Sequence, residues 1–285
     1  MSKLLCVLIF SLWFTCSLSR THLEHIRRQV SLAEGIRIDR ACESVHQDQW
    51  NHAVNSRYPN DPSYCVSKSV VAFHGPSGPG SSLETTKPLR EMLNSIFHNR
   101  SMSVRTFADI PCGDWLWMQE VNLSGVQYLG GDISEETIKR NNRCFRRPNV
   151  EFVYFDLTCM VPPAVDLILV RDILFHLKPE VAIDILGRLV RSGIKYIAST
   201  TYPKTGRPNS NWRIGAYQET LKDRPNSQIG YYSIRLNDSP FNFPEPLMQV
   251  EEDASLPGHK LVRRLVGVWE LHDLDKYFVT SGGKL

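Results

Sequence analysis

The sequence predicts an α/β fold, a Rossmann-like doubly wound sheet of seven mostly parallel strands with an antiparallel C-terminal edge strand. Two observations predict it. Short runs of β-forming residues alternate with helical stretches between Val104 and Thr200, a pattern typical of parallel sheets covered by helices on both faces. Successive runs also end in charged side chains, as expected where parallel strands finish at one shared edge.

The first strand is expected over the β-forming run from Val104 to Asp109. A turn containing Pro111 and Gly113 follows, and Gly113 suits a backbone that takes a positive φ or passes close to a ligand. The next stretch, Trp115–Val121, is expected to continue as a helix. Strand, tight turn and helix form the opening unit of a parallel sheet, and ligands bind where such a turn leaves the strand.

Further strands are expected where runs of the same character recur along the chain. These runs are Val126–Gly131, which leads into Asp132; Val150–Phe155, which leads into Asp156; Val165–Val170, which leads into Arg171 and Asp172; and Lys195–Thr200. Two later runs, Leu247–Glu251 and Leu265–Leu271, are expected to complete the sheet with an antiparallel edge. The charged residues at the strand ends are therefore expected to line one rim of the sheet.

Three helices are expected to cover the sheet. The first has Pro88 in its first turn, the second follows Ser134 as N-cap and runs to about Arg147, and the third starts at Pro179. Apolar residues recur at helical spacing in the first helix (Leu89, Met92, Leu93, Ile96, Phe97) and in the third (Ala182, Ile185, Leu186, Leu189, Val190). These faces are expected to pack on the sheet.

Composition and the N-terminus bear on the class of protein and on its compartment. A chain of 285 residues with 42% hydrophobic residues has ample material for a core, and a net charge of +3 gives no reason to expect nucleic-acid binding. Met1–Ser19 has a positive start, an apolar stretch short for a membrane span, and small residues at its end. We expect a cleaved signal peptide, with an uncleaved anchor as the alternative, and a protein that is secreted or lumenal in the secretory pathway.

Five of the seven cysteines lie beyond this segment: Cys42, Cys65, Cys112, Cys144 and Cys159. In an oxidising compartment some pairing is expected, and the odd number leaves at least one thiol free or intermolecular. Cys112 is expected to be the free thiol, and Cys42 with Cys65 and Cys144 with Cys159 are the simplest pairs. No C-x-x-C or His-x-x-x-His spacing supports a zinc site, so no metal is expected.

Three Asn-x-Ser triplets, which begin at Asn99, Asn122 and Asn237, are N-glycosylation acceptors by sequence. Pro240 directly follows the third triplet and makes it the least suitable of them.

Three segments carry a resemblance to a known family. They are the turn Asp109–Trp115, the segment Arg171–Leu177 with the pattern Arg-Asp-x-x-Phe-His-Leu, and the segment Pro240–Leu247. Together with the acids at the strand ends, they resemble class I S-adenosylmethionine-dependent methyltransferases, and in particular a secreted branch with the same turn. The resemblance covers roughly Ser77–Leu274. It implies S-adenosylmethionine as the cofactor and names no acceptor.

The resemblance implies cofactor contacts at the rim of the sheet. For the methionine part of the cofactor, Asp109, Cys112 and Gly113 would form the turn beside it, and Arg171 would contact its carboxylate. Asp132 would accept from the ribose hydroxyls. Ile133 would pack against adenine, and Asp156 and Leu157 would bind the adenine edge. An acid after the second strand suits a ribose in Rossmann-like folds generally. Structural alternatives remain for Asp109 as a strand-end cap, Asp132 as a helix cap, Asp156 as a solvated carboxylate and Arg171 as the partner of Asp172.

Catalysis is expected at Asp172 and His176. The two residues are four positions apart, so on a helix their side chains would share one face. A histidine held by a carboxylate can act as general base toward a hydroxyl, which favours an oxygen acceptor on a small molecule or glycan; a structural histidine is the alternative. Candidate walls of the substrate site, with a core role as the alternative, are Trp212, Arg213, Phe241, Asn242 and Phe243.

The expected domains are a signal peptide over residues 1–19, an N-terminal extension over 20–76 that packs on the core as short helices and loops, and a methyltransferase-like domain over 77–285. Gly75–Ser82 is either a flexible connection or a loop that folds over the cofactor. The long polar segment Thr201–Ser239 is expected to form a lid or a substrate-side segment.

Two other classes of function compete with methyl transfer. A nicotinamide-dependent oxidoreductase shares the strand, turn and ribose carboxylate, but the G-x-G-x-x-G turn is absent. A catalytically inactive binding module is suggested by Pro111 and Trp115, which stand where members of the resembling family often have glycine. Carboxylates that line one rim argue instead for a bound ligand. The sequence does not indicate an oligomeric state.

Overall fold

The computed structural model describes residues 31–39, 65, 77–203, 233–253 and 263–274. The predicted signal peptide, Cys42, Trp212, Arg213 and most of the predicted lid lie outside these ranges. Within the described ranges, no helix has the length and apolar character needed to cross a membrane.

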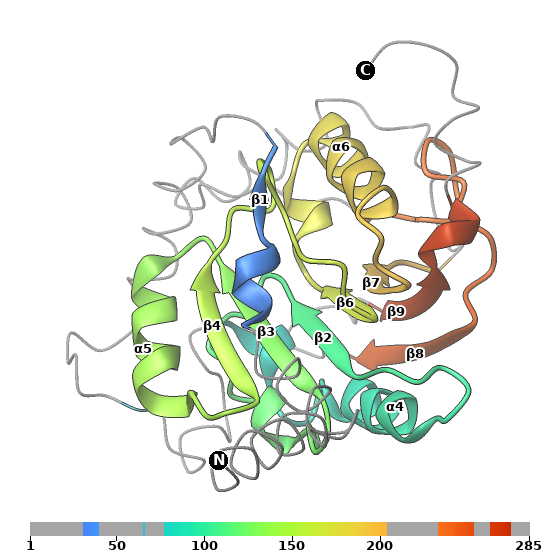
Figure 1. Cartoon of the computed structure of the whole chain (residues 1–285). Coiled ribbons are helices and arrows are strands. Elements are labelled where there is room, and N and C mark those ends of the chain that lie inside the picture. The colour runs from blue at the N-terminus through green and yellow to red at the C-terminus, as the bar shows by residue number, and fades with distance from the viewer. Residues whose placement is uncertain (1–30, 40–64, 66–76, 204–232, 254–262, 275–285) are drawn as a thin grey trace, which may run out of the picture.

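A seven-stranded sheet forms the centre of the molecule (Figure 1). Its order is β4 (Val150–Tyr154), β3 (Gln127–Asp132), β2 (Thr106–Asp109), β6 (Leu167–Val170), β7 (Tyr196–Thr201), β9 (Arg263–Glu270) and β8 (Met248–Asp253). The first five strands are parallel to one another, and β9 is antiparallel both to β7 and to β8. The predicted fold class is confirmed, and β9 is the strand that runs against the others, while β8 forms the edge.

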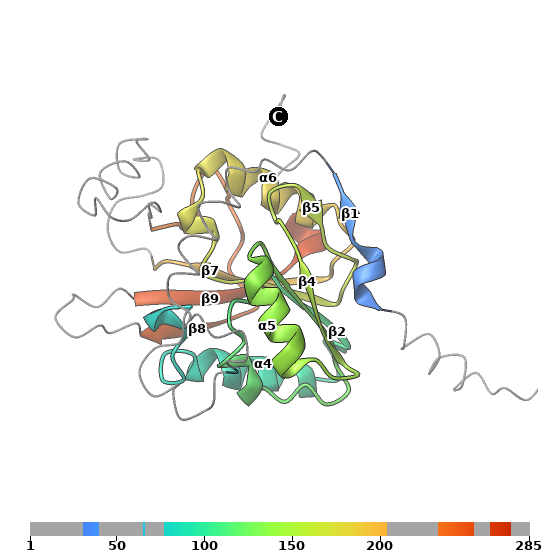
Figure 2. The same cartoon turned by 90° about the vertical axis from the view of Figure 1, so that its left-hand side faces the viewer.

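Helices cover both faces of the sheet. Alternate residues of each strand point to opposite sides, so Phe107 packs in one core with α4 (Lys87–His98), and Ala108 packs in a second core with α6 (Pro179–Val190). The helix α5 (Glu135–Phe145) lies on the same side as α4, as Figure 2 shows. The crossovers through α5 and α6 thus place the strand ends at one open edge.

The three helices form where the sequence predicts them, because their ends are defined by local chemistry. The Ser134 hydroxyl accepts a hydrogen bond from the Thr137 amide at 3.3 Å, and two glutamates occupy the first turn of α5. Prolines stand in the first turns of α4 and α6, where a missing N–H costs nothing. All five apolar residues predicted to face the sheet from α4 are buried.

The predicted helix over Trp115–Val121 is wrong. Only a 3-10 turn, η4 (Met118–Glu120), forms there, and Trp115, with a φ of 59°, lies outside any helix. Trp115 is 1% exposed, and its ring lies edge-on to Tyr128 and Phe152 at 5.7 and 5.3 Å. Burial of a large aromatic side chain therefore decides the local backbone.

Part of the N-terminal extension packs on the core. The 3-10 turn η1 (Leu32–Gly35) is capped by Ser31, whose hydroxyl also bonds the Glu151 carboxylate. The strand β1 (Arg37–Ile38) pairs with β5 (Met160–Val161) as a separate two-stranded sheet. The sequence predicts short helices and loops for the extension; residues 31–39 contain a 3-10 turn and also a strand, which was not predicted.

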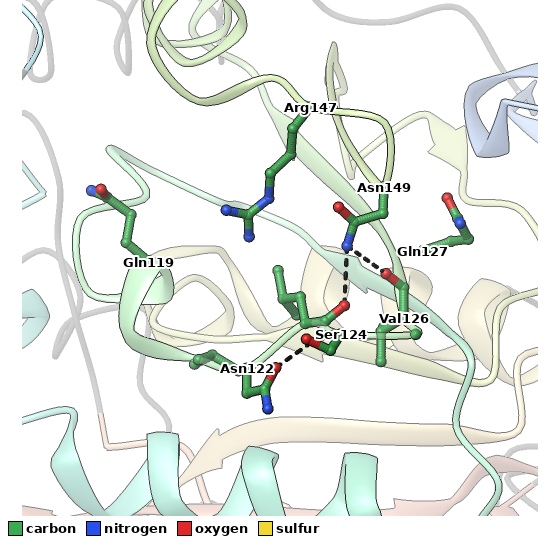
Figure 3. Close-up of a pocket in the computed structure, with 10 residues that line it drawn as sticks. Gln119, Asn122, Ser124, Val126, Gln127, Arg147 and Asn149 are labelled. Carbon is green, nitrogen blue, oxygen red and sulfur yellow. Dashed lines mark hydrogen bonds between the residues drawn. The ribbon is translucent and has the colours of Figure 1, made fainter.

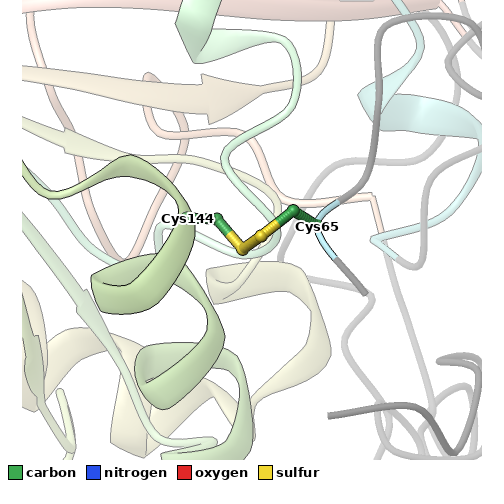
Figure 4. Close-up of a disulfide and its surroundings, with 2 residues drawn as sticks. All are labelled: Cys65 and Cys144. Atoms are coloured by element: carbon green, nitrogen blue, oxygen red, sulfur yellow. A yellow bond between two sulfur atoms is a disulfide. The ribbon is translucent and has the colours of Figure 1, made fainter. Parts of the chain in front are cut away.

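The disulfide pairing differs from the predicted one. Cys65 is bonded to Cys144 across a sequence separation of 79 residues, with a Cα–Cα distance of 5.7 Å (Figure 4). The predicted pairs Cys42–Cys65 and Cys144–Cys159 are therefore wrong. Cys144 lies half-buried at the end of α5, whereas Cys159 is buried in the turn before β5 and has its own disulfide, so closeness along the chain did not decide the pairing. Cys112 is free and buried, as predicted.

Candidate functional site

Three acidic residues stand at the carboxyl ends of neighbouring parallel strands. Asp109 ends β2 and Asp132 ends β3, and Asp156 lies two residues beyond the end of β4. Their exposed fractions are 2%, 7% and 1%. The structure thus brings together at one edge the three acids that the sequence predicts there. Buried carboxylates are costly unless they are paired or neutral, so each needs an explanation.

Asp132 links the turn after β2 with the turn after β3. One carboxylate oxygen accepts from the Gly113 amide at 3.0 Å and the other accepts from the Ser134 amide at 2.9 Å. Burial raises the pKa of Asp132 to about 6, although these backbone donors oppose the rise. The Ile133 amide also donates to this group, and a carboxylate has about four lone-pair positions, so Asp132 retains acceptor capacity for a hydroxyl group.

Asp109 lies beneath the same edge, on the central strand. The Tyr128 hydroxyl donates to its carboxyl group at 2.8 Å. Burial raises the pKa of Asp109 to about 7, while the Tyr128 hydrogen bond and the charge of Arg171 act in the opposite direction. The group therefore changes charge near neutral pH and responds to any cation placed beside it.

Asp156 carries an acceptor that the fold itself does not use. One oxygen accepts from both the amide and the hydroxyl of Thr158, at 2.8 and 2.6 Å. The other oxygen is buried and has no hydrogen-bond partner in the described part of the chain. A buried acceptor without a donor is rare in folded proteins and indicates a place for a donor from outside. Leu157 beside it is buried, and Ile133, after β3, is half-buried.

The segment that begins at Ser77 packs on the turn after β2. Asp114 accepts from the Ser77 amide at 2.9 Å, and its own amide donates to the Ser77 hydroxyl at 2.9 Å. Gly113 has a φ of 54°, and a Cβ there would lie 2.5 Å from the Ser77 oxygen. Position 113 therefore requires glycine for two reasons: its backbone has a positive φ, and Ser77 lies too close for a side chain. Next to it, burial raises the pKa of the Cys112 thiol well above its usual value, so the thiol stays neutral.

Four charged side chains form a buried charge cluster at the end of β6: Arg171, Asp172, Glu252 and Arg264. Arg171 bonds Glu252 at 3.0 Å and Asp172 at 3.2 Å, and Arg264 bonds Asp172 at 2.7 Å. Arg171 also donates to the Gly80 carbonyl in η3 (Pro79–Ser81), and its guanidinium lies over the Trp117 ring. The cluster is neutral overall and ties the Ser77–Ser81 segment to three strands.

The sequence predicts two members of this cluster and misses the other two. Arg171 pairs with Asp172, as the structural alternative proposed, but Glu252 and Arg264 complete the set from β8 and β9. Burial alone would raise the pKa of Asp172, but Arg171 and Arg264 outweigh burial and lower it. Glu252 and Arg264 face each other in the β8–β9 register. The sequence shows an acid and a base near two expected strands, but it does not give the register that places Glu252 opposite Arg264.

No helix connects Asp172 with His176. Asp172 has a φ of 56°, and the only helical turn here is the 3-10 turn η5 (Leu174–His176). The charge of His176 nevertheless contributes to the lowered pKa of Asp172. Asp172 also accepts from the Thr200 hydroxyl at 3.1 Å, and the half-buried His176 ring contacts Phe175 at 4.3 Å. The predicted shared helix face is therefore wrong, and the pairing of His176 with Asp172 stays a prediction.

Phe241 and Phe243, two of the aromatic residues predicted as possible walls of a substrate site, belong to the core. Phe241 and Phe243 are 1% and 3% exposed, and Phe243 packs against Trp269 at 5.4 Å. Asn242 between them is exposed and has a φ of 50°. Among the described residues, no group of three or more His, Cys, Asp or Glu side chains could hold a metal ion.

No protein-family model and no curated protein matches the chain. Solved structures of methyltransferases match it. The N-methyltransferase NodS from Bradyrhizobium japonicum, in complex with S-adenosylhomocysteine, has a TM-score of 0.50 at 11% identity over 78% of this chain and 98% of its own. The 1,6-didemethyltoxoflavin-N1-methyltransferase of Burkholderia thailandensis has a TM-score of 0.49 at 13% identity over 82% and 94%. The similarity to NodS shows that this chain shares its fold.

Proposed function

We propose that the chain binds S-adenosylmethionine at the edge formed by β2, β3 and β4 and transfers its methyl group to an acceptor. The observation that carries the proposal is the row of buried acids Asp109, Asp132 and Asp156, the last with an unpaired acceptor oxygen. A fold without a ligand gains nothing from desolvating three carboxyl groups side by side. NodS, which shares the fold, was solved with S-adenosylhomocysteine.

The nucleoside half of the cofactor fits the groups at β3 and β4. Asp132 would accept from the two ribose hydroxyls through its free lone pairs, and Ile133 would pack against the adenine ring. The unpaired oxygen of Asp156 would accept from the adenine amino group, and the Leu157 amide would donate to the ring. These contacts supply donors to the buried acceptor and leave each carboxylate satisfied.

The methionine half fits the turn after β2. Gly113 and Cys112 would let the ligand approach the backbone, and Asp109 would face its ammonium group. A cation there would lower the pKa of Asp109 from about 7, so binding would release a proton near neutral pH. Since Arg171 is neutralised by Glu252 and Asp172, we propose that it aids binding by holding the Ser77–Ser81 segment through Gly80.

The bound cofactor supplies a methyl group made electrophilic by its sulfonium. The protein has to align the acceptor with that group and, for a hydroxyl acceptor, to remove a proton. His176, whose charge helps to lower the pKa of Asp172, is the proposed general base. We propose a small-molecule or glycan oxygen as the acceptor and the secretory pathway as the compartment. The Cys65–Cys144 disulfide supports an oxidising environment.

One observation favours a second candidate, a binding module of the same fold without transferase activity. The donors of Arg171 go to Gly80, Glu252 and Asp172, so no free guanidinium awaits the methionine carboxylate. A nicotinamide-dependent oxidoreductase is disfavoured, because that fold continues with a parallel sixth strand, whereas β9 here is antiparallel.

The test is calorimetric titration of the mature chain, from Arg20, with S-adenosylmethionine and separately with NAD. We expect binding of the first and, in Asp132→Ala, a loss of affinity of about 10- to 100-fold, because two hydrogen bonds to hydroxyls are removed. Glu136→Ala is the matched control, since Glu136 is an exposed acid in the first turn of the adjacent helix. Circular dichroism confirms that each variant is folded. A folded wild-type chain that binds neither ligand would overturn the proposal.

A further inference from the structure

Two of the three Asn-x-Ser triplets lie on the edge of the sheet opposite the candidate site. Asn99 follows α4 and precedes β2, and Asn122 precedes β3, so both stand near the amino ends of parallel strands. The Asn122 amide donates to the Asn94 side chain in α4 at 2.8 Å, which holds the two segments together. The third triplet begins at Asn237, beyond the carboxyl end of β7.

Asn122 is exposed and presents its amide nitrogen outward. Its side-chain oxygen accepts from the Ser124 amide at 3.0 Å, and Figure 3 shows the nitrogen turned away from Ser124. This nitrogen makes no hydrogen bond within the described part of the chain. Asn122 also borders an open pocket of about 500 Å³, across which lie Arg147 and Asn149. A large substituent on Asn122 would therefore meet open space.

Asn99 has the same local arrangement. Its side-chain oxygen accepts from the Ser101 amide at 2.8 Å and from the Met102 amide at 3.4 Å. Asn99, Arg100 and Ser101 are all exposed. The oxygen is thus held by the backbone and the nitrogen is left to solvent, as at Asn122.

Asn237 is arranged in the opposite way. Its amide nitrogen donates to the carbonyls of Pro244 at 2.9 Å and of Phe243 at 3.4 Å, and the residue is half-buried. A glycan on this nitrogen would replace one N–H and force the side chain out of the loop. Since N-glycans are attached as the chain enters the secretory pathway, only sites that stay exposed after folding are compatible with the native structure.

We propose that Asn99 and Asn122 carry N-linked glycans and that Asn237 does not. The donor is a lipid-linked oligosaccharyl diphosphate. The amide nitrogen forms a bond to C1 of the first sugar, the bond from C1 to the diphosphate oxygen breaks, and the nitrogen loses one proton as the lipid diphosphate leaves. The inference rests on the proposed secretory compartment. Because both glycans would project from the edge opposite Asp109 and Asp132, they would leave cofactor binding unchanged.

The test is expression of the full chain in a eukaryotic secretory host, with the medium and the cytosol collected separately. Peptide-N-glycosidase digestion and peptide mass spectrometry then locate the modified asparagines. We expect Asn99→Gln and Asn122→Gln each to remove one step of the glycosidase-dependent mobility shift, and Ser124→Ala to match Asn122→Gln. Asn237→Gln, the control, is expected to leave the shift unchanged.

The outcomes separate this inference from the proposal on compartment. A secreted chain with unmodified Asn99 or Asn122, or with a glycan on Asn237, would overturn the inference and leave the compartment standing. A chain that stays in the cytosol, without cleavage near Ser19, would overturn both. Titration of the secreted chain with S-adenosylmethionine before and after glycosidase treatment is expected to give the same affinity.

Discussion

At the scale of single residues, the candidate edge holds buried acids of two kinds. The pKa of Asp172 lies below its usual value because the charges of Arg171 and Arg264 outweigh the effect of burial. Asp109 and Asp132 lack such close cations, so burial dominates and raises their pKa to about 7 and about 6. Asp172 contributes to the buried charge cluster, whereas Asp109 and Asp132 are poised to respond to a ligand. The charge cluster and the acids with a raised pKa therefore need separate tests.

The buried charge cluster should be sensitive to the loss of one member. Glu252 is 0% exposed and bonds Arg171, so Glu252→Gln would leave two buried guanidinium groups with one counter-charge. We expect the free energy of unfolding to fall by about 3–5 kcal/mol, measured by urea denaturation. Glu251→Gln, which alters the neighbouring exposed pair with Arg263, is the control and should cause no measurable change. Equal stability of the two variants would show that the cluster is not coupled to folding.

Asp109 should make stability depend on pH near neutrality. Its pKa is 3.8 in the unfolded chain and about 7 in the folded one, so between these values the folded state holds a proton that the unfolded state has released. This contribution is full below pH 3.8 and is lost as pH rises through 7. Asp109→Asn cannot titrate, so its stability relative to wild type should rise by on the order of 3 kcal/mol between pH 4 and 8.

The control for that titration is Asp166→Asn. Burial would raise the pKa of Asp166, but Lys195 and the amides of Arg105 and Thr106 outweigh burial and lower it. Its contribution is therefore lost only in acid, and the difference between this variant and wild type should stay constant from pH 5 to 8. If Asp109→Asn showed the same constant difference, the raised pKa of Asp109 would be wrong. Unfolding curves at each pH provide both comparisons.

At the scale of elements, the sequence predicts what periodicity and end chemistry control. The helices with Ser134, Pro88 and Pro179 at their starts form as predicted, because a cap or a proline marks each of them locally. Trp115–Val121 has helix-forming residues, but Trp115 packs against aromatic rings from β3, β4 and α5. That interaction depends on tertiary packing, which no local pattern contains.

The same distinction applies to the candidate site. Asp109, Asp132 and Asp156 could be placed at one edge because parallel strands end together. Glu252 and Arg264 could not be added, because they come from strands after a long insertion whose register is set by pairing with β7 and with each other. The pairing of Cys65 with Cys144 was hidden for a similar reason, since 79 residues separate them.

The turn after β2 should tolerate no side chain at Gly113. Gly113→Ala would combine a φ of 54° with a Cβ only 2.5 Å from the Ser77 oxygen, and would push Ser77 away from Asp114. Gly125→Ala is the matched control: its φ is 75°, but the nearest atom to its Cβ is 3.6 Å away. We expect the control to lose about 1–2 kcal/mol from backbone strain alone. Gly113→Ala should lose more and should also weaken S-adenosylmethionine binding in calorimetry.

Equal losses of stability in the two alanine variants, with S-adenosylmethionine affinity retained in Gly113→Ala, would contradict this account. That result would mean that Ser77 can move without consequence. It would also favour the interpretation of Gly75–Ser82 as a flexible connection over a loop that folds onto the cofactor.

At the scale of the whole molecule, the chain before the sheet is joined to it at separate points. Arg37–Ile38 pairs with β5, Cys65 is bonded to Cys144 near the end of α5, and Ser77–Ser81 packs on the edge of β2 and β6. Each contact joins a distant part of the sequence to an element around the candidate site. The N-terminal extension is therefore integrated with the domain at the described positions, and its removal should affect the stability of the sheet.

The disulfide should stabilise the fold mainly through the unfolded chain. Closing a loop across 79 residues restricts the unfolded ensemble, so the double variant Cys65→Ser, Cys144→Ser should lose about 2–4 kcal/mol in urea denaturation. Its affinity for S-adenosylmethionine should be unchanged, because Ser77 is held by Asp114 and Gly80 is held by Arg171 without help from the disulfide. Cys112→Ala, which removes a free buried thiol and no crosslink, should cost less stability. A double variant that keeps its stability but loses affinity would reverse this assignment, since the disulfide would then act in the folded state by positioning the Ser77–Ser81 segment.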